Sequence, residues 1–190
     1  DAGPLDALAL RAAAGVADPL EWICPLQLAL PAAPEAAARV EGRSLSLDPV
    51  RTAFEALAGR HELVIVEGAG GLLVPFDPGT CMADLARTLG LPVLVVARAA
   101  LGTINHTLLT LEAARARDLE VLGVVISHAS GPLSDADAEN LAVLRRTLGT
   151  RTIGEVGPAA EPDAVSARDA GIDVVLARWT RGREREAAGR

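Results

Sequence analysis

Short apolar runs alternate along the chain with longer stretches in which apolar and polar residues mix. The runs at 63–66, 93–96 and 121–126 are rich in β-branched residues, and shorter or similar runs lie at 151–156 and 172–177. Because apolar residues follow one another in these runs instead of alternating with polar ones, the runs predict strands that are covered on both faces.

The mixed stretches between these runs predict helices, expected at 5–14, 48–57, 80–89, 103–117, 134–148 and 161–170. Gly90, Gly149 and Gly171 directly follow three of them, as is typical of helix C-termini. The segment 25–34 contains three prolines and predicts a loop before a short Ala-rich helix. Alternation of strand and helix at this spacing predicts an α/β fold with a mostly parallel sheet, whose ligands bind beyond the carboxyl ends of the strands.

Length and composition predict one globular domain over 1–180, followed by a solvated tail at 181–190. The chain has 190 residues, half of them hydrophobic, and a net charge of −7, which argues against a nucleic-acid partner. No apolar run reaches the roughly 18 residues that a membrane span needs, and the first residues do not form a signal peptide. We therefore expect a cytoplasmic protein with no membrane contact.

The first candidate site is Glu67, which follows the run 63–66 and precedes Gly68-Ala69-Gly70-Gly71. This order places a carboxylate at the ligand edge of the sheet, beside backbone N–H groups that glycines allow an anion to approach. Such a carboxylate suits Mg²⁺, which proteins hold through one or two carboxylates. Taken alone, the motif is equally compatible with a tight turn and a solvated glutamate.

The second candidate is Gly102-Thr103-Ile104-Asn105-His106, which follows a predicted strand and begins a long helix. Thr103 is expected to cap this helix, and the N–H groups of its first turn form a possible site for a carboxylate or phosphate. An ordinary capped helix explains the same residues. His106 is as compatible with a structural role as with a ligand contact.

Several familiar motifs are absent from these 190 residues. The sequence contains no GxxxxGK[ST] loop and no cluster of Cys and His, and every basic residue is Arg, so that no Lys is present to contact phosphate. Asp6, in the first predicted helix, carries no chemical implication by itself and is compatible with a helix surface.

The region from Val66 to Ile126 resembles the dethiobiotin synthetase family. The pairing of EGAGG at 67–71 with LGTINHTLLT at 101–110 carries this resemblance, which extends over most of the chain and weakens after Arg151. It implies a three-layer sandwich of the P-loop nucleotide hydrolase type and a homodimer with the substrate site at the subunit interface. It also implies an enzyme that closes the ureido ring of dethiobiotin from 7,8-diaminononanoate, CO₂ and ATP, with Mg²⁺.

By position, the resemblance also implies site residues. Asp6 and Glu67 match the acids that bind Mg²⁺. The residues implied to contact ATP are Asp6, Glu67, Gly68, Ala69, Gly70, Ser127, His128, Gly157, Pro158 and Ala159. Those implied to bind the diaminononanoate carboxylate or its surroundings are Gly70, Gly102, Thr103, Ile104 and Asn105.

One departure from the family limits these expectations. The family's first strand, its phosphate loop with Lys and Thr, and its second strand with a catalytic Lys are expected to precede Asp1, so no catalytic residue is expected in this chain. An alternative interpretation is a non-catalytic dimeric relative that acts as a regulatory or interaction module. A related amidotransferase-type ligase or partition-type ATPase shares the fold, but GTINHTLLT at 102–110 argues against it.

Overall fold

The computed structural model describes residues 4–128, 133–157 and 170–188. The chain divides into two compact units, Asp1–Gly90 and Leu91–Arg190, and each is described here by itself. The expectation of one domain over 1–180 stays a prediction. Within the described ranges, no helix is long and apolar enough to cross a membrane.

The first unit is mainly helical. Its elements are α1 (Leu5–Ala14), α2 (Leu20–Ile23), α3 (Pro34–Val40), α4 (Asp48–Ala58), β1 (Pro75–Asp77), β2 (Thr80–Cys81) and α5 (Met82–Leu89). The helices predicted at 5–14, 48–57 and 80–89 are confirmed, although α5 begins two residues late because Thr80–Cys81 pairs antiparallel with β1. Buried Phe76, Met82 and Leu85 form a small core beside this hairpin.

The predicted strand at 63–66 is wrong for the described structure. Residues 62–67 belong to no helix or strand, and Ile65 is 82% exposed. A strand exists only through hydrogen bonds to a neighbour, and no strand in the described part of this unit pairs with 63–66. The apolar pattern is therefore present without the ladder that would make it a strand.

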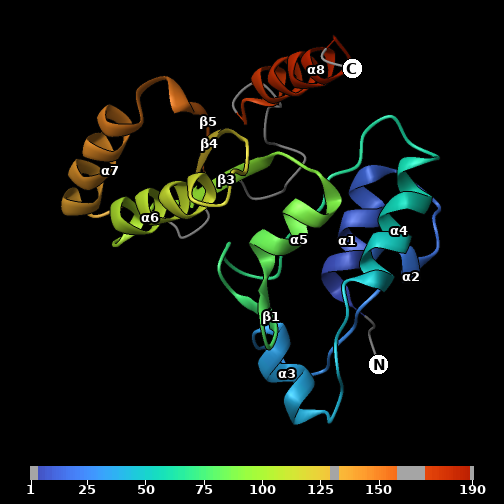
Figure 1. Cartoon of the computed structure of the whole chain (residues 1–190). Coiled ribbons are helices and arrows are strands. Elements are labelled where there is room, and N and C mark those ends of the chain that lie inside the picture. Colours follow the sequence, from blue (N-terminus) through green and yellow to red (C-terminus); the bar gives the residue numbers. More distant parts are fainter. Residues whose placement is uncertain (1–3, 129–132, 158–169, 189–190) are drawn as a thin grey trace. The chain divides into compact units, whose positions relative to one another are not determined.

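The second unit contains a parallel three-stranded sheet in the order β3-β4-β5. Its elements are β3 (Val93–Arg98), α6 (Thr103–Arg115), β4 (Val121–Ser127), α7 (Asp135–Leu148), the 3-10 turn Gly149–Arg151, β5 (Thr152–Val156) and α8 (Ile172–Ala188). Figure 1 shows α6 and α7 beside the sheet. The core between them includes fully buried Val124, Ile126, Leu141 and Leu144. The predicted strands at 93–96, 121–126 and 151–156 are confirmed, as is the parallel sheet. The helix predicted at 161–170 falls almost entirely outside the described residues.

The strand predicted at 172–177 is wrong, because this run begins α8. A short apolar run does not distinguish a strand from a buried helix segment, and here the pattern continues through Arg178 and Trp179 as a helix. Arg178 holds α8 against the sheet by donating to the carbonyl oxygens of Leu122 and of Thr150, the latter at 3.0 Å. The segment expected as a tail, 181–190, continues α8 as far as Ala188.

Candidate functional site

Glu67 lies on an exposed segment of the first unit that belongs to no helix or strand. The loop that follows it has a defined shape: Gly70 has φ +81°, and a Cβ added there would lie 3.0 Å from Cγ2 of Val74. Only glycine adopts this left-handed backbone without strain, so Gly70 sets the turn. Beyond the turn, Ala83 N–H at the start of α5 donates to the Leu72 carbonyl at 2.9 Å.

Asp6 lies in the first turn of α1 and is exposed like Glu67. Neither carboxylate makes a hydrogen bond or ion pair to a residue in the described ranges, so both keep their oxygens available. Those ranges contain no group of three or more His, Cys, Asp or Glu side chains that could hold a metal by itself. Two available carboxylates fit Mg²⁺, which completes its shell with water and phosphate oxygens. The pairing of Asp6 with Glu67 stays a prediction.

In the second unit, Gly102 and not Thr103 caps α6. Gly102 has φ +87°, and the Thr103 side chain makes no capping hydrogen bond, so the expected role of Thr103 as cap is wrong. Gly102 fits the cap position because its left-handed backbone turns the chain from β3 into the helix. The N–H groups of Ile104 and Asn105, in the first turn of α6, have no partner within the helix and are oriented to receive an anion.

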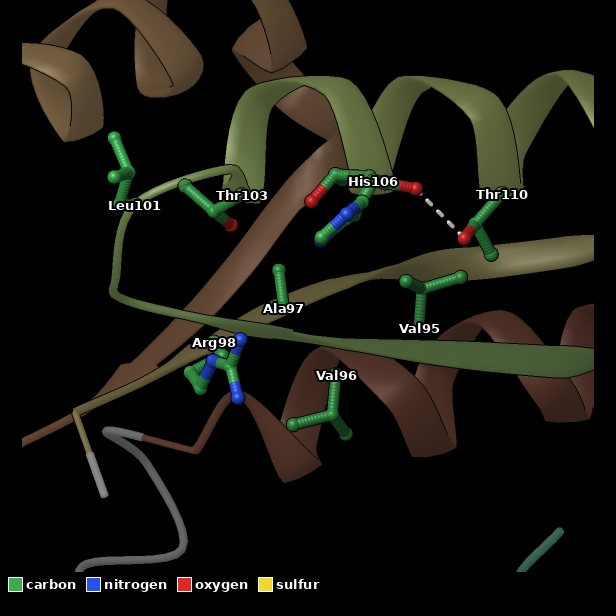
Figure 2. A pocket seen from close by; sticks show the side chains of 9 residues that line it. Val95, Val96, Ala97, Arg98, Leu101, Thr103, His106 and Thr110 are labelled. Carbon is green, nitrogen blue, oxygen red and sulfur yellow. Dashed lines mark hydrogen bonds between the residues drawn. The ribbon is translucent and has the colours of Figure 1, made fainter. Parts of the chain in front are cut away.

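A pocket of about 220 Å³ lies between β3 and α6, close to this helix start. Its helical wall is formed by the polar side chains of Thr103, His106, Thr107 and Thr110. Figure 2 shows Thr103 and His106 extending from α6 over Ala97 of β3, and Thr110 donates to the His106 carbonyl at 2.8 Å. Thr107 and Thr110 are not among the predicted site residues, although the spacing 103, 106, 107 and 110 places them on one helix face.

The two segments expected beside adenine adjoin in the structure. Ser127, at the end of β4, pairs with Val156 of β5, and His128 N–H donates to the Val156 carbonyl at 2.9 Å. Gly157 therefore follows directly beside His128, at the carboxyl ends of the two strands. Pro158 and Ala159 lie outside the described residues.

His128 also belongs to a charged cluster that the sequence did not predict. His128 Nε2 lies 2.6 Å from Oε1 of Glu155, and Arg145 Nε of α7 donates to Oε2 of the same carboxylate at 3.0 Å. The hydrogen bond from Arg145 lowers the pKa of Glu155 from 4.5; partial burial opposes this, and His128 adds to it. Glu155 thereby connects the end of β4, β5 and α7.

Replacing Glu155 by Gln is expected to lower the free energy of unfolding by about 1 kcal/mol near neutral pH, since a partly exposed charged hydrogen bond is worth less than a buried one. Because the folded-state pKa of Glu155 lies below 4.5, its contribution is present above that value and is lost as the pH falls through the folded-state pKa. Urea unfolding at about pH 7 and about pH 3 measures this difference. Glu139→Gln, an exposed site on α7, is the control. A difference that persists unchanged in acid contradicts the assignment.

Comparison with known proteins agrees with this fold. The sequence model of the family described as "AAA domain" matches residues 4–165. The ATP-dependent dethiobiotin synthetase BioD of Anaeromyxobacter dehalogenans (strain 2CP-C) is 58% identical over 132 residues, which are 70% of this chain and 59% of the relative. That of Anaeromyxobacter sp. (strain Fw109-5) is 48% identical over 153 residues, covering 80% and 69%. That of Aromatoleum aromaticum is 42% identical over 158 residues, covering 83% and 70%.

The parallel sheet and the AAA match define the chain as an α/β protein of the P-loop nucleotide hydrolase class, as predicted. Within that class, the chain belongs to the dethiobiotin synthetase family. The aligned region spans 59% of the length of the first relative.

Proposed function

We propose that the protein is an ATP- and Mg²⁺-dependent dethiobiotin synthetase that acts on 7,8-diaminononanoate and CO₂ in the cytoplasm. The observation that carries this proposal is the 58% identity to an ATP-dependent dethiobiotin synthetase over 132 residues, which are 70% of this chain. The available carboxylates of the first unit and the helix start of the second supply the two chemical functions that such a reaction needs: metal binding and anion binding.

In the proposed reaction, one amine of the substrate and CO₂ form a carbamate. The γ-phosphoryl group of ATP transfers to the carbamate oxygen and ADP leaves. The second amine then attacks the carbonyl carbon, phosphate leaves, and the ureido ring closes with loss of protons to solvent. Positioning and charge neutralisation are the main tasks of a protein in such phosphoryl transfer.

The chain's residues take the following roles in this proposal. Asp6 and Glu67 hold Mg²⁺, whose charge offsets that of the phosphates when it is bound. The turn Gly68–Gly70 lies along the phosphates, and Ser127, His128 and the segment from Gly157 to Ala159 contact adenine. At the helix start 102–105, the N–H groups of Ile104 and Asn105 bind the substrate carboxylate, with the partner of a homodimer completing the site.

Release of phosphate from ATP by the full-length protein tests this function. We expect release to require diaminononanoate, CO₂ and Mg²⁺ together, with one phosphate formed per ring closed. Nucleotide binding without any substrate-dependent release would instead favour a non-catalytic relative with a regulatory or interaction role.

A further inference from the structure

The charged cluster of His128, Glu155 and Arg145 joins one carboxylate to three donors. Arg145 donates twice, from Nε to Oε2 at 3.0 Å and from Nη2 to Oε1. His128 Nε2 lies 2.6 Å from the same Oε1. We refer to these three residues as the Glu155 cluster. Both oxygens of Glu155 are therefore engaged as acceptors.

The place of the proton on the His128 ring follows from this network. The hydrogen bond from Arg145 holds the pKa of Glu155 below its ordinary value, partial burial opposes this and His128 adds to it, so that the carboxyl is ionised near neutral pH. An ionised carboxylate only accepts hydrogen bonds. Nε2 of His128 must therefore carry a proton and donate. In a neutral imidazole the other ring nitrogen, Nδ1, is then an acceptor.

Nδ1 of His128 has no partner in the described part of the chain. Nε2 is bonded to Glu155, and the backbone N–H donates to the Val156 carbonyl at 2.9 Å. The side chain is 15% exposed, so part of the ring remains open to a ligand. His128 directly follows Ser127 at the carboxyl end of β4, the edge at which ligands of parallel sheets bind. An acceptor is thus held where the base of the nucleotide is proposed to lie.

We propose that Glu155 is a positioning residue for base recognition: it holds the His128 ring so that Nδ1 accepts a hydrogen bond from the 6-amino group of adenine. The inference rests on the proposed function in that His128 contacts adenine. Inosine triphosphate (ITP) carries an oxygen in place of this amino group, so an acceptor would face an acceptor. A binding site disfavours a ligand of similar shape when polar groups are left unpaired in this way. The Glu155 cluster therefore favours ATP over ITP.

Glu155→Ala removes the group that holds the ring, and Nδ1 no longer keeps one position. In the full-length protein we expect the KM for ATP to rise about fivefold, the size expected for one hydrogen bond, with kcat at saturating ATP little changed. The KM for ITP should change little, because ITP gains nothing from an acceptor at this place. The assay is run at about pH 8.5, where imidazoles are neutral.

Arg145→Ala is the matched control, because it removes the ion pair of the cluster and leaves the bond between Glu155 and His128 in place. It should keep the preference for ATP while losing stability. Glu139→Ala, at an exposed site on α7, controls for the lost charge and should change neither quantity.

NMR of the protein labelled with ¹⁵N-histidine observes the ring directly. A proton bound to Nε2 of His128 is expected in the unsubstituted protein and in Arg145→Ala. Its signal should disappear in Glu155→Ala, because a proton without an acceptor in the protein exchanges with water.

Equal rises in the KM for ATP and for ITP would overturn the proposal, since they would mean that Glu155 only holds the strand ends together. An unchanged preference for ATP in Glu155→Ala would overturn it as well, as would a proton on Nδ1 in place of Nε2 in the unsubstituted protein. If the full-length protein closes no ring, the proposed function fails. Calorimetric binding of ATP and ITP to the same variants then still decides whether Glu155 sets the preference.

Discussion

Replacing Glu67 by Gln is expected to reduce Mg²⁺-dependent ring closure by about 10²-fold or more. The substitution keeps the size of the side chain but removes the charge that makes it a Mg²⁺ ligand. Since Glu67 is exposed and makes no hydrogen bond or ion pair within the described ranges, the fold should not depend on it. Steady-state assay of the full-length variant, with thermal unfolding alongside, separates the two effects.

Glu62→Gln is the control for this substitution, because Glu62 is also exposed and lies on the same segment 62–67. It should retain nearly full activity and an unchanged unfolding temperature. Full activity in Glu67→Gln would show that Glu67 is a turn residue without a role in metal binding.

Replacing Gly102 by Ala is expected to raise the KM for diaminononanoate roughly 10- to 100-fold by displacing the first turn of α6. The backbone of Gly102 has φ +87°, and the added Cβ would lie 3.2 Å from Cε1 of His106. The left-handed conformation alone costs a residue with a side chain roughly 1–2 kcal/mol. Urea unfolding and the KM for diaminononanoate, measured on one preparation, report the two effects.

Gly90→Ala provides a matched comparison, because Gly90 caps α5 with φ +63° and a Cβ there would meet nothing within 4 Å. This variant should lose similar stability while keeping the KM for diaminononanoate. An unchanged KM in Gly102→Ala would mean that the helix start does not bind the substrate carboxylate.

The strand β4 could be predicted from sequence because it lies between β3 and β5, and buried parallel strands are apolar throughout. The same rule predicted β3, although β3 lies at the edge of the described sheet and its Val96 is 65% exposed. The same rule failed at 172–177, where a short apolar run belongs to a helix, and at 63–66, where no neighbouring strand is present among the described residues. In both cases the apolar run alone does not decide the element, because the hydrogen-bonding partner that makes a strand lies elsewhere in the chain.

Part of the candidate site could likewise be predicted from the sequence, and part could not. The helix start at Gly102 was predictable because a strand, a glycine and a helix follow one another directly in sequence. The bonds of Glu155 to His128 and of His61 to Asp18 were not, since they join residues 27 and 43 positions apart. Such contacts depend on strand register and helix packing, which single residues do not encode.

Mass spectrometry of the product formed from ¹³C-labelled CO₂ tests the central claim most directly. The full-length protein, given ATP, Mg²⁺ and 7,8-diaminononanoate, is expected to form dethiobiotin that carries one ¹³C atom in the ureido carbonyl. Absence of labelled dethiobiotin from a folded protein that binds ATP would contradict the claim that this family member closes the ureido ring.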